Sequence, residues 1–327
     1  MPINKDRLGR SLSPVRGTSG DVKSMSVDEA VATLPLEQVV AQDDTEKFEK
    51  KVRRCIPSEF VLIASQDSTS QAQEDFFAMN HFQLPFRDEG RQRWLNSELA
   101  GSVATCALLH LFYQHPNAWV ASSTPKRTFT TLELVQEIQT RIQKCSKQLA
   151  NPTLSSSRPL GPPRLDDGEY APYYIVPPTH LAGKRRALLI GCVTGENAPL
   201  KGPLNDIANV RHFLIQHCGF LPDNITMLQD DASLPLEQRP TKENIQKAFS
   251  TVIANSHPGD VNFLQFSGHG NRSPTNLYIL PADYKASGYI QDDWILNNLI
   301  KAMPKNVYTT FLVDCCYSGT VRILSVY

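Results

Sequence analysis

The sequence has no long hydrophobic segment and no excess of charge. No apolar run reaches the roughly 18–20 residues of a membrane helix, and residues 1–7 lack the hydrophobic centre of a signal peptide. Lysine plus arginine equals aspartate plus glutamate, at 33 each, so net charge indicates neither a nucleic-acid partner nor a membrane surface. We therefore expect a cytoplasmic protein that binds neither.

The cysteines lack the spacing of a disulfide framework or a zinc site. There are seven of them, an odd number, and no CxxC pair. This pattern favours reduced thiols over disulfide bonds and agrees with a cytoplasmic location. An ordinary composition, with 41% hydrophobic and 20% charged residues, predicts a folded globular protein.

The chain divides into four stretches. Residues 1–48 mix Ser, Pro, Gly and charge without periodicity, which predicts a flexible tail. Residues 49–150 contain a strand-like run at 59–65 and helical patterns at about 96–113 and 131–148. Residues 151–183 are proline-rich and are interpreted as a connector, with an edge strand at 173–176. The fourth stretch is 184–327.

Residues 184–327 alternate between strand and helix patterns. Strands are predicted at 187–191, 224–228, 261–266 and 307–313, and helices at 205–216, 241–257 and 292–303. Repeated strand–helix units of this kind predict an α/β fold with a mainly parallel sheet and helices on both faces.

Two short motifs directly follow predicted strands. Ser267-Gly268-His269-Gly270 follows one, and Asp314-Cys315-Cys316-Tyr317-Ser318-Gly319 begins at the end of another. The carboxyl ends of parallel strands meet at one edge of a sheet, where such folds place their chemistry. A cysteine and a histidine there are the minimum for a thiolate nucleophile and its proton carrier.

These motifs resemble those of the caspase-type cysteine peptidases, and specifically the metacaspases. His269 precedes Cys316 by roughly 50 residues, the separation expected of caspase-type enzymes. Residues 184–322 resemble the large, catalytic (p20-like) region of that family. The smaller (p10-like) region resembles residues 49–150, upstream instead of downstream, an order that is similar to the type III metacaspases of algae. The resemblance implies a caspase-like fold and a cysteine endopeptidase.

The resemblance also implies the catalytic residues. Cys316 is the nucleophile, whereas Cys315, its neighbour on an alternating strand end, is expected to face the core. His269 is the proton carrier, and the backbone N–H groups of Gly270 and Cys316 form the oxyanion hole.

Three further positions match the family's substrate pocket. These are Asp206, Asp314 and Ser267. Two carboxylates in one pocket favour a cation between them, so cleavage is expected after Arg or Lys in peptide or protein substrates. The alternative is that Asp206 only begins a helix and Asp314 is a solvated strand end.

Calcium activation is implied by the resemblance, through carboxylates beside the sheet. Asp292 and Asp293 match two ligand positions, and oxygen donors suit Ca²⁺. The third position is Asn276, and the fourth is Ile323, which cannot coordinate a metal. The alternative is that the two aspartates only begin a helix.

Two other functions stay open at this point. One is a catalytically silent caspase-fold scaffold or regulator, which the presence of both His269 and Cys316 argues against. The other is a His/Cys hydrolase of the same fold with a different specificity. The resemblance implies a monomer in either case.

Overall fold

The computed structural model describes residues 54–66, 74–75, 78, 82–84, 100–122, 127–145, 152–158, 172–195, 199–272, 277–316 and 318. All of them belong to one compact unit, Glu46–Tyr327. The tail predicted over residues 1–48 lies outside the described residues, so that prediction stays untested.

A six-stranded sheet forms the centre of the fold, with the strand order β5-β1-β13-β9-β7-β8. The strands are β1 (Glu59–Ala64), β5 (Thr153–Ser156), β7 (Arg185–Gly191), β8 (Ile225–Gln229), β9 (Val261–Ser267) and β13 (Tyr308–Asp314). All neighbours are parallel except β5, which runs antiparallel to β1 at one edge. The predicted α/β class and mainly parallel sheet are confirmed.

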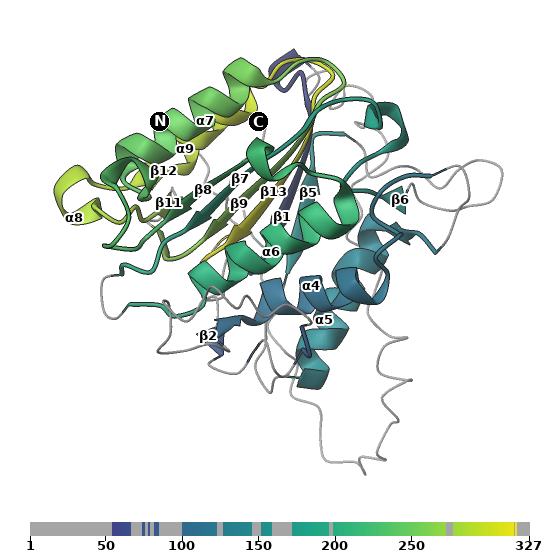
Figure 1. Ribbon diagram of the computed structural model, residues 1–327, viewed down its shortest axis with the longest axis horizontal. Helices are drawn as coiled ribbons and strands as arrows, with labels where there is room; N and C mark the ends of the chain where they lie inside the picture. The colour runs from purple at the N-terminus through teal and green to yellow at the C-terminus, as the bar shows by residue number, and fades with distance from the viewer. Residues whose placement is uncertain are drawn as a thin grey trace, which may run out of the picture. The chain divides into compact units, whose positions relative to one another are not determined.

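Both faces of the sheet are covered by helices, as Figure 1 shows. Because side chains alternate along a strand, Phe263 of β9 joins one buried cluster and Leu264 joins the other. The first cluster includes residues of α4 (Val103–Gln114), α5 (Thr131–Cys145) and α6 (Pro203–Cys218). The second includes residues of α7 (Lys242–Asn255) and α9 (Asp292–Ile295). The continuous apolar character of the central strands follows from burial on both sides.

The helix ends follow from local sequence. Thr241 caps α7, since its hydroxyl accepts from the Asn244 N–H at 3.2 Å. Pro203 begins α6, where the first N–H groups have no acceptor within the helix, so the missing N–H of proline breaks no hydrogen bond. Gly219 ends the helix in the left-handed conformation. The helix predicted at 96–113 begins later, at Val103, because Ser102 caps it.

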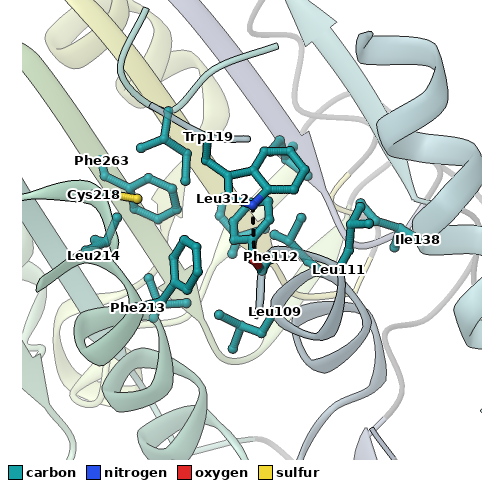
Figure 2. Packing of buried hydrophobic residues seen from close by; sticks show 14 of the residues in the cluster. Leu109, Leu111, Phe112, Trp119, Ile138, Phe213, Leu214, Cys218, Phe263 and Leu312 are labelled. Carbon is teal, nitrogen blue, oxygen red and sulfur yellow. Dashed lines mark hydrogen bonds between the residues drawn. The ribbon is translucent and has the colours of Figure 1, made fainter. Parts of the chain in front are cut away.

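The region upstream of β7 shares its core with the region downstream. Phe112 of α4 packs on Trp119 with 4.5 Å between ring centroids, and on Phe213 of α6 with 5.1 Å (Figure 2). The Trp119 indole donates to the Phe112 carbonyl at 3.1 Å, which satisfies its buried N–H. The two regions therefore stabilise each other through one continuous hydrophobic cluster.

The stretch interpreted as a connector, 151–183, is more ordered than its composition indicates. It contains β5, and it contains β6 (Pro172–Tyr173), which pairs with β4 (Phe129–Thr130) in a separate sheet. The serine-rich sequence forms β5 because the pairing with β1 satisfies its backbone, and the Ser157 hydroxyl accepts from the Phe60 N–H at 2.7 Å. The edge strand predicted at 173–176 is the shorter β6, followed by a single bridge between Val176 and Val120.

Smaller elements complete the described part of the fold. A three-stranded sheet consists of β10 (Gly270–Arg272), β11 (Leu277–Ile279) and β12 (Ile290–Gln291), and a two-stranded one of β2 (Glu74–Asp75) and β3 (Gly101–Ser102). The helix α8 covers Tyr284–Ser287, and α9 continues as a π-helical turn, Leu296–Ile300. Short 3₁₀ turns are η3 (Pro178–His180), η4 (Pro222–Asn224) and η5 (Leu236–Gln238). Among the described residues, no helix is both long and apolar enough to cross a membrane.

Candidate active site

The histidine and cysteine motifs begin at paired positions of two neighbouring strands. Ser267 of β9 pairs with Asp314 of β13 in parallel register, and the Gly268 N–H donates to the Asp314 carbonyl at 3.1 Å. His269 and Cys316 each follow the paired residue by two positions, and both are half-buried. The two motifs therefore emerge together at the carboxyl edge of the sheet.

Gly270 brings the histidine segment into contact with the cysteine segment. A Cβ atom at this position would lie 2.5 Å from the Cys316 carbonyl oxygen and 2.7 Å from the Cys315 sulfur. No larger residue fits without moving the backbone that carries Cys316. The close packing of the two segments thus depends on a glycine directly after His269.

The two adjacent cysteines have different environments. Cys315 is fully buried in the cluster beneath α7 and α9, as alternation along the strand predicted. Burial raises the pKa of the Cys315 thiol well above its ordinary value, and the neighbouring Cys316 and Asp314 add to this. Cys315 therefore stays a protonated thiol, and such cysteines are chemically inert. Of the two, only Cys316 is partly exposed to solvent.

Asp206 and Ser267 are joined directly. The Ser267 hydroxyl donates to Asp206 Oδ2 at 2.9 Å, and the Ser102 N–H donates to Asp206 Oδ1 and Oδ2 at 3.1 and 3.3 Å. Asp206 lies in the first turn of α6 but is only 1% exposed. Its contacts reach β9 and the start of α4, so it does more than begin a helix.

Asp314 is also buried and lies on the same face of the sheet. It shares this face with Leu312, two residues earlier, and accepts a hydrogen bond from the Thr105 hydroxyl of α4. The alternative that Asp314 is a solvated strand end is wrong, because its exposed fraction is 3%. Burial raises the pKa of the Asp314 carboxyl, and hydrogen bonds from Ser102, Thr105 and Ser65 oppose that effect.

Sequence reasoning missed two residues that donate hydrogen bonds to these carboxylates, the N-cap of α4 and a residue in its first turn. Ser102 and Thr105 stand three residues apart at the start of an Ala- and Leu-rich helix, where the Ser102 hydroxyl also caps the Thr105 N–H at 3.5 Å. Polar residues at such positions are typical of helix caps, and nothing in the sequence distinguishes a second role. Only the packing of α4 against α6 and β13 shows it.

Ser318 connects the segment after Cys316 to the end of β1. Its hydroxyl accepts from the Gln66 N–H at 3.1 Å and lies 3.4 Å from the Ser65 hydroxyl. Asp314, two residues before the cysteine, is thus paired with β9, and Ser318, two residues after it, is hydrogen-bonded to the residues that follow β1.

Comparisons with known proteins decide the family. Residues 185–325 match the family model described as "Metacaspase, peptidase C14 domain". Metacaspase III c of Phaeodactylum tricornutum is 31% identical over 290 residues, which cover 84% of this chain and 77% of that protein. The chain belongs to the metacaspase family.

Other metacaspases match over a shorter stretch. Metacaspase-1A of Neurospora crassa is 38% identical over 44% of this chain and 34% of its own length. Metacaspase-1B of Aspergillus clavatus is 35% identical over 54% of this chain and 45% of its own length. The chain thus spans less than half of these two relatives but most of Metacaspase III c. The match to Metacaspase III c covers 290 residues, which is more than the range 185–325 contains. It therefore extends upstream into the region that contains β1.

A solved structure, protein GSU0716 from Geobacter sulfurreducens, aligns with 21% identity and a TM-score of 0.32. The alignment covers 42% of this chain and 53% of that one. A similarity this low contributes nothing to the assignment, which stands on the metacaspase relatives.

The residues matched to the metacaspase calcium site are only partly described. Asp292 begins α9 and is buried, and its Oδ1 accepts from the Asp293 N–H at 2.9 Å, whereas Asp293 is exposed. No three His, Cys, Asp or Glu side chains cluster as metal ligands in the described part of the chain. Asn276 and Ile323 lie outside the described residues, and calcium binding stays a prediction.

Proposed function

We propose that this metacaspase is a cysteine endopeptidase that cleaves after Arg or Lys. The observation that carries the proposal is the pairing of Ser267 with Asp314, which brings His269 and Cys316 to one sheet edge beside two buried carboxylates. The role proposed for each residue is the one that the resemblance implies, and this arrangement and the chemistry of the side chains support it.

Cys316 is the nucleophile in the proposed mechanism. Its thiol proton passes to His269, the sulfur attacks the carbonyl carbon of the scissile peptide, and a carbon–sulfur bond forms. The carbon–nitrogen bond then breaks as His269 gives the proton to the leaving amine. Water attacks the resulting thioester, His269 takes a proton from that water, and the thiol is restored as the carboxylic acid leaves.

Backbone N–H groups of Gly270 and Cys316 would stabilise the oxyanion formed in both steps. Losing one such donor typically costs about 2.7–4 kcal/mol of transition-state stabilisation. The contact between Gly270 and the Cys316 backbone supports this role, because it holds the two segments at close distance.

The acidic groups beside the dyad account for the proposed specificity. Asp206 and Asp314 lie on the face of the sheet covered by α4 and α6, with the Ser267 hydroxyl bound to Asp206. A guanidinium or ammonium group entering there would favour the ionised form of Asp314, whose pKa is raised by burial in its absence. Substrates with Asp at the same position would instead meet like charges.

One assay tests the proposal. Fluorogenic peptides ending in Arg, Lys or Asp are incubated with the wild-type chain, with Cys316→Ala and with Cys315→Ala. We expect cleavage after Arg and Lys only, no turnover by Cys316→Ala, and activity retained by Cys315→Ala, because Cys315 is an inert buried thiol. Cleavage after Asp, or turnover that survives Cys316→Ala, would contradict the assignment.

The carboxylates are tested by two single substitutions. Asp206→Asn and Asp314→Asn should each raise KM for Arg peptides by about 10- to 100-fold, since each removes a charge-assisted hydrogen bond worth about 1.5–3 kcal/mol. Asp223→Asn is the matched control, because Asp223 is exposed in η4 and distant in the chain from both motifs. Equal KM values in all three variants would show that the pocket lies elsewhere.

The catalytically silent scaffold is the second candidate. A peptide with a C-terminal arginyl chloromethyl ketone distinguishes the two functions, because alkylation of the Cys316 sulfur requires both a reactive thiol and an acidic pocket that binds the arginine side chain. Rapid, single-site labelling supports the peptidase. A folded chain that resists the reagent supports the scaffold. For a hydrolase with another specificity, a positional-scanning peptide library identifies the preferred residue.

A further inference from the structure

The loop that follows β7 crosses the end of the strand that carries His269. The Cys192 N–H donates to the Ser267 carbonyl at 2.9 Å. A Cβ atom at Gly268 would lie 2.9 Å from the Cys192 carbonyl oxygen, so the loop and the histidine segment are in direct contact. A shift of this loop would therefore also displace the segment that carries His269.

A single carboxylate oxygen fixes the next two residues of the loop. Oδ2 of Asp230, which directly follows β8, accepts from the Val193 N–H at 3.1 Å and the Thr194 N–H at 2.7 Å. The same oxygen accepts from the Thr194 hydroxyl at 2.6 Å. The Asp230 N–H in turn donates to the Gly191 carbonyl at 3.0 Å, which ties the carboxylate to the end of β7. Hydrogen bonds to an ionised acceptor are stronger than neutral ones, so the loop backbone is firmly held.

Gly195, the next residue, lies against the imidazole of His269. A Cβ atom built at Gly195 would be 2.1 Å from Nε2, 2.4 Å from Cδ2 and 2.7 Å from Cε1. Any other residue would displace the ring or the loop. The absence of a side chain at 195 allows the loop backbone to lie close to the Nε2 side of the imidazole ring.

We infer that Asp230 is a positioning residue for His269 and acts through Gly195. The carboxylate holds residues 193 and 194, these place Gly195, and Gly195 restricts the orientation of the imidazole. A proton carrier must be aligned with both the thiol and the leaving amine, and a displacement of about 1 Å can cost about 100-fold in rate. The catalytic part of this inference rests on the proposed peptidase function.

The test uses four variants of the full chain. Asp230→Ala removes the three contacts described above and a fourth, from the Cys192 thiol at 3.8 Å. Asp230→Asn keeps an acceptor oxygen of the same size without the charge. Thr194→Val removes only the hydroxyl contact and keeps both backbone donors. Asp231→Ala is the matched control, because Asp231 accepts from the Ser233 N–H at 2.8 Å and the Ser233 hydroxyl at 2.6 Å in the following turn.

The readout separates orientation from binding. We expect Asp230→Ala to lower kcat by about 10- to 100-fold with little change in KM for an Arg peptide, and to alter the pH profile of kcat/KM. Asp230→Asn should recover most of the rate, Thr194→Val should show a smaller loss, and Asp231→Ala should equal wild type. If Asp230→Ala does not fold, the kcat and pH profile of Thr194→Val decide the outcome. Wild-type kcat and pH profile in a folded Asp230→Ala, or in Thr194→Val where only that variant folds, would overturn the inference.

A second measurement keeps this inference distinct from the proposed function. The side-chain nitrogen resonances of His269 are recorded by NMR in the Cys316→Ala background, where no turnover is needed. If the chain has no peptidase activity but Asp230→Ala, and not Asp231→Ala, changes the tautomer or titration of His269, the peptidase proposal fails and the positioning role stands. Unchanged His269 resonances in both variants would remove the positioning role.

Discussion

The Thr105 hydroxyl donates a hydrogen bond to the Asp314 carboxylate, although the two residues are 209 positions apart in the chain. Thr105 belongs to α4, upstream of the residues that match the metacaspase family model, and Asp314 ends the strand that leads to Cys316. The upstream region thus supplies part of the environment of a proposed substrate-binding carboxylate. It cannot be removed without changing that pocket.

Thr105→Val is expected to weaken both the pocket and the fold. The substitution removes a donor from a buried acceptor, which costs about 1–3 kcal/mol of stability, and raises the pKa of Asp314 further. KM for Arg peptides should therefore rise, and Tm should fall. Thr105→Ser keeps the hydroxyl and serves as the control. Equal KM and Tm values in Thr105→Val and wild type would mean that the hydrogen bond contributes nothing.

The pH dependence of stability should carry a contribution from Asp314. Burial raises the pKa of the Asp314 carboxyl in the folded chain above the ordinary 3.8, which we take for the unfolded chain. At pH values between 3.8 and the raised pKa, the folded chain therefore holds a proton that the unfolded chain has lost. Stability from this group is therefore greatest below pH 3.8 and falls as the pH rises through the raised pKa. Asp314→Asn should lose this dependence, which thermal unfolding at a series of pH values measures. Parallel Tm–pH curves for the two proteins would contradict the prediction.

Gly270→Ala is expected to lower activity strongly and to destabilise the fold only modestly. The added methyl group would meet the Cys316 backbone oxygen and the Cys315 sulfur, so the catalytic segment must shift. Overpacking of this kind typically costs about 1–3 kcal/mol of stability, whereas a displaced nucleophile can cost about 100-fold in kcat. Arg272→Ala, at an exposed position of the same strand, is the control. Full activity in Gly270→Ala would show that the segment tolerates the shift.

Calcium dependence is tested by titration of the peptidase rate. If the resemblance to other metacaspases holds for the metal, activity should rise with calcium and fall on chelation, and Asp293→Asn should shift the titration to higher calcium. Asp223→Asn is again the control, at an exposed turn. A flat response in the wild-type chain would remove the metal from the mechanism. The buried orientation of Asp292 predicts that Asp292→Asn affects Tm as well as any calcium response.

The strands and helices around the catalytic edge could be predicted because each is marked locally. The apolar run of β9 and the threonine cap of α7 are readable from neighbouring residues alone. The expectation that Cys315 faces the core needed only alternation along β13. The resemblance of the motifs then indicated His269 and Cys316 as the reacting pair.

Contacts between distant segments could not be predicted in the same way. β5 is short and serine-rich, and it forms a strand only because β1 offers backbone partners. Thr105 and Asp230 resemble ordinary polar residues until α4 and the loop after β7 are placed beside the sheet edge. One sequence shows which residues are able to form such contacts, but the partners are set by tertiary packing.

The place of β13 in the sheet has a consequence for synthesis on the ribosome. β13 lies between β1 and β9, yet both of these strands are made before it. Until Tyr308–Asp314 emerges, each of them lacks a neighbour on that side, and long-range strand pairing of this kind is slow to form. The proposed nucleophile, Cys316, comes two residues after that strand, so it is made only after all six strands of the main sheet. A nascent chain that lacks β13 therefore also lacks the proposed nucleophile.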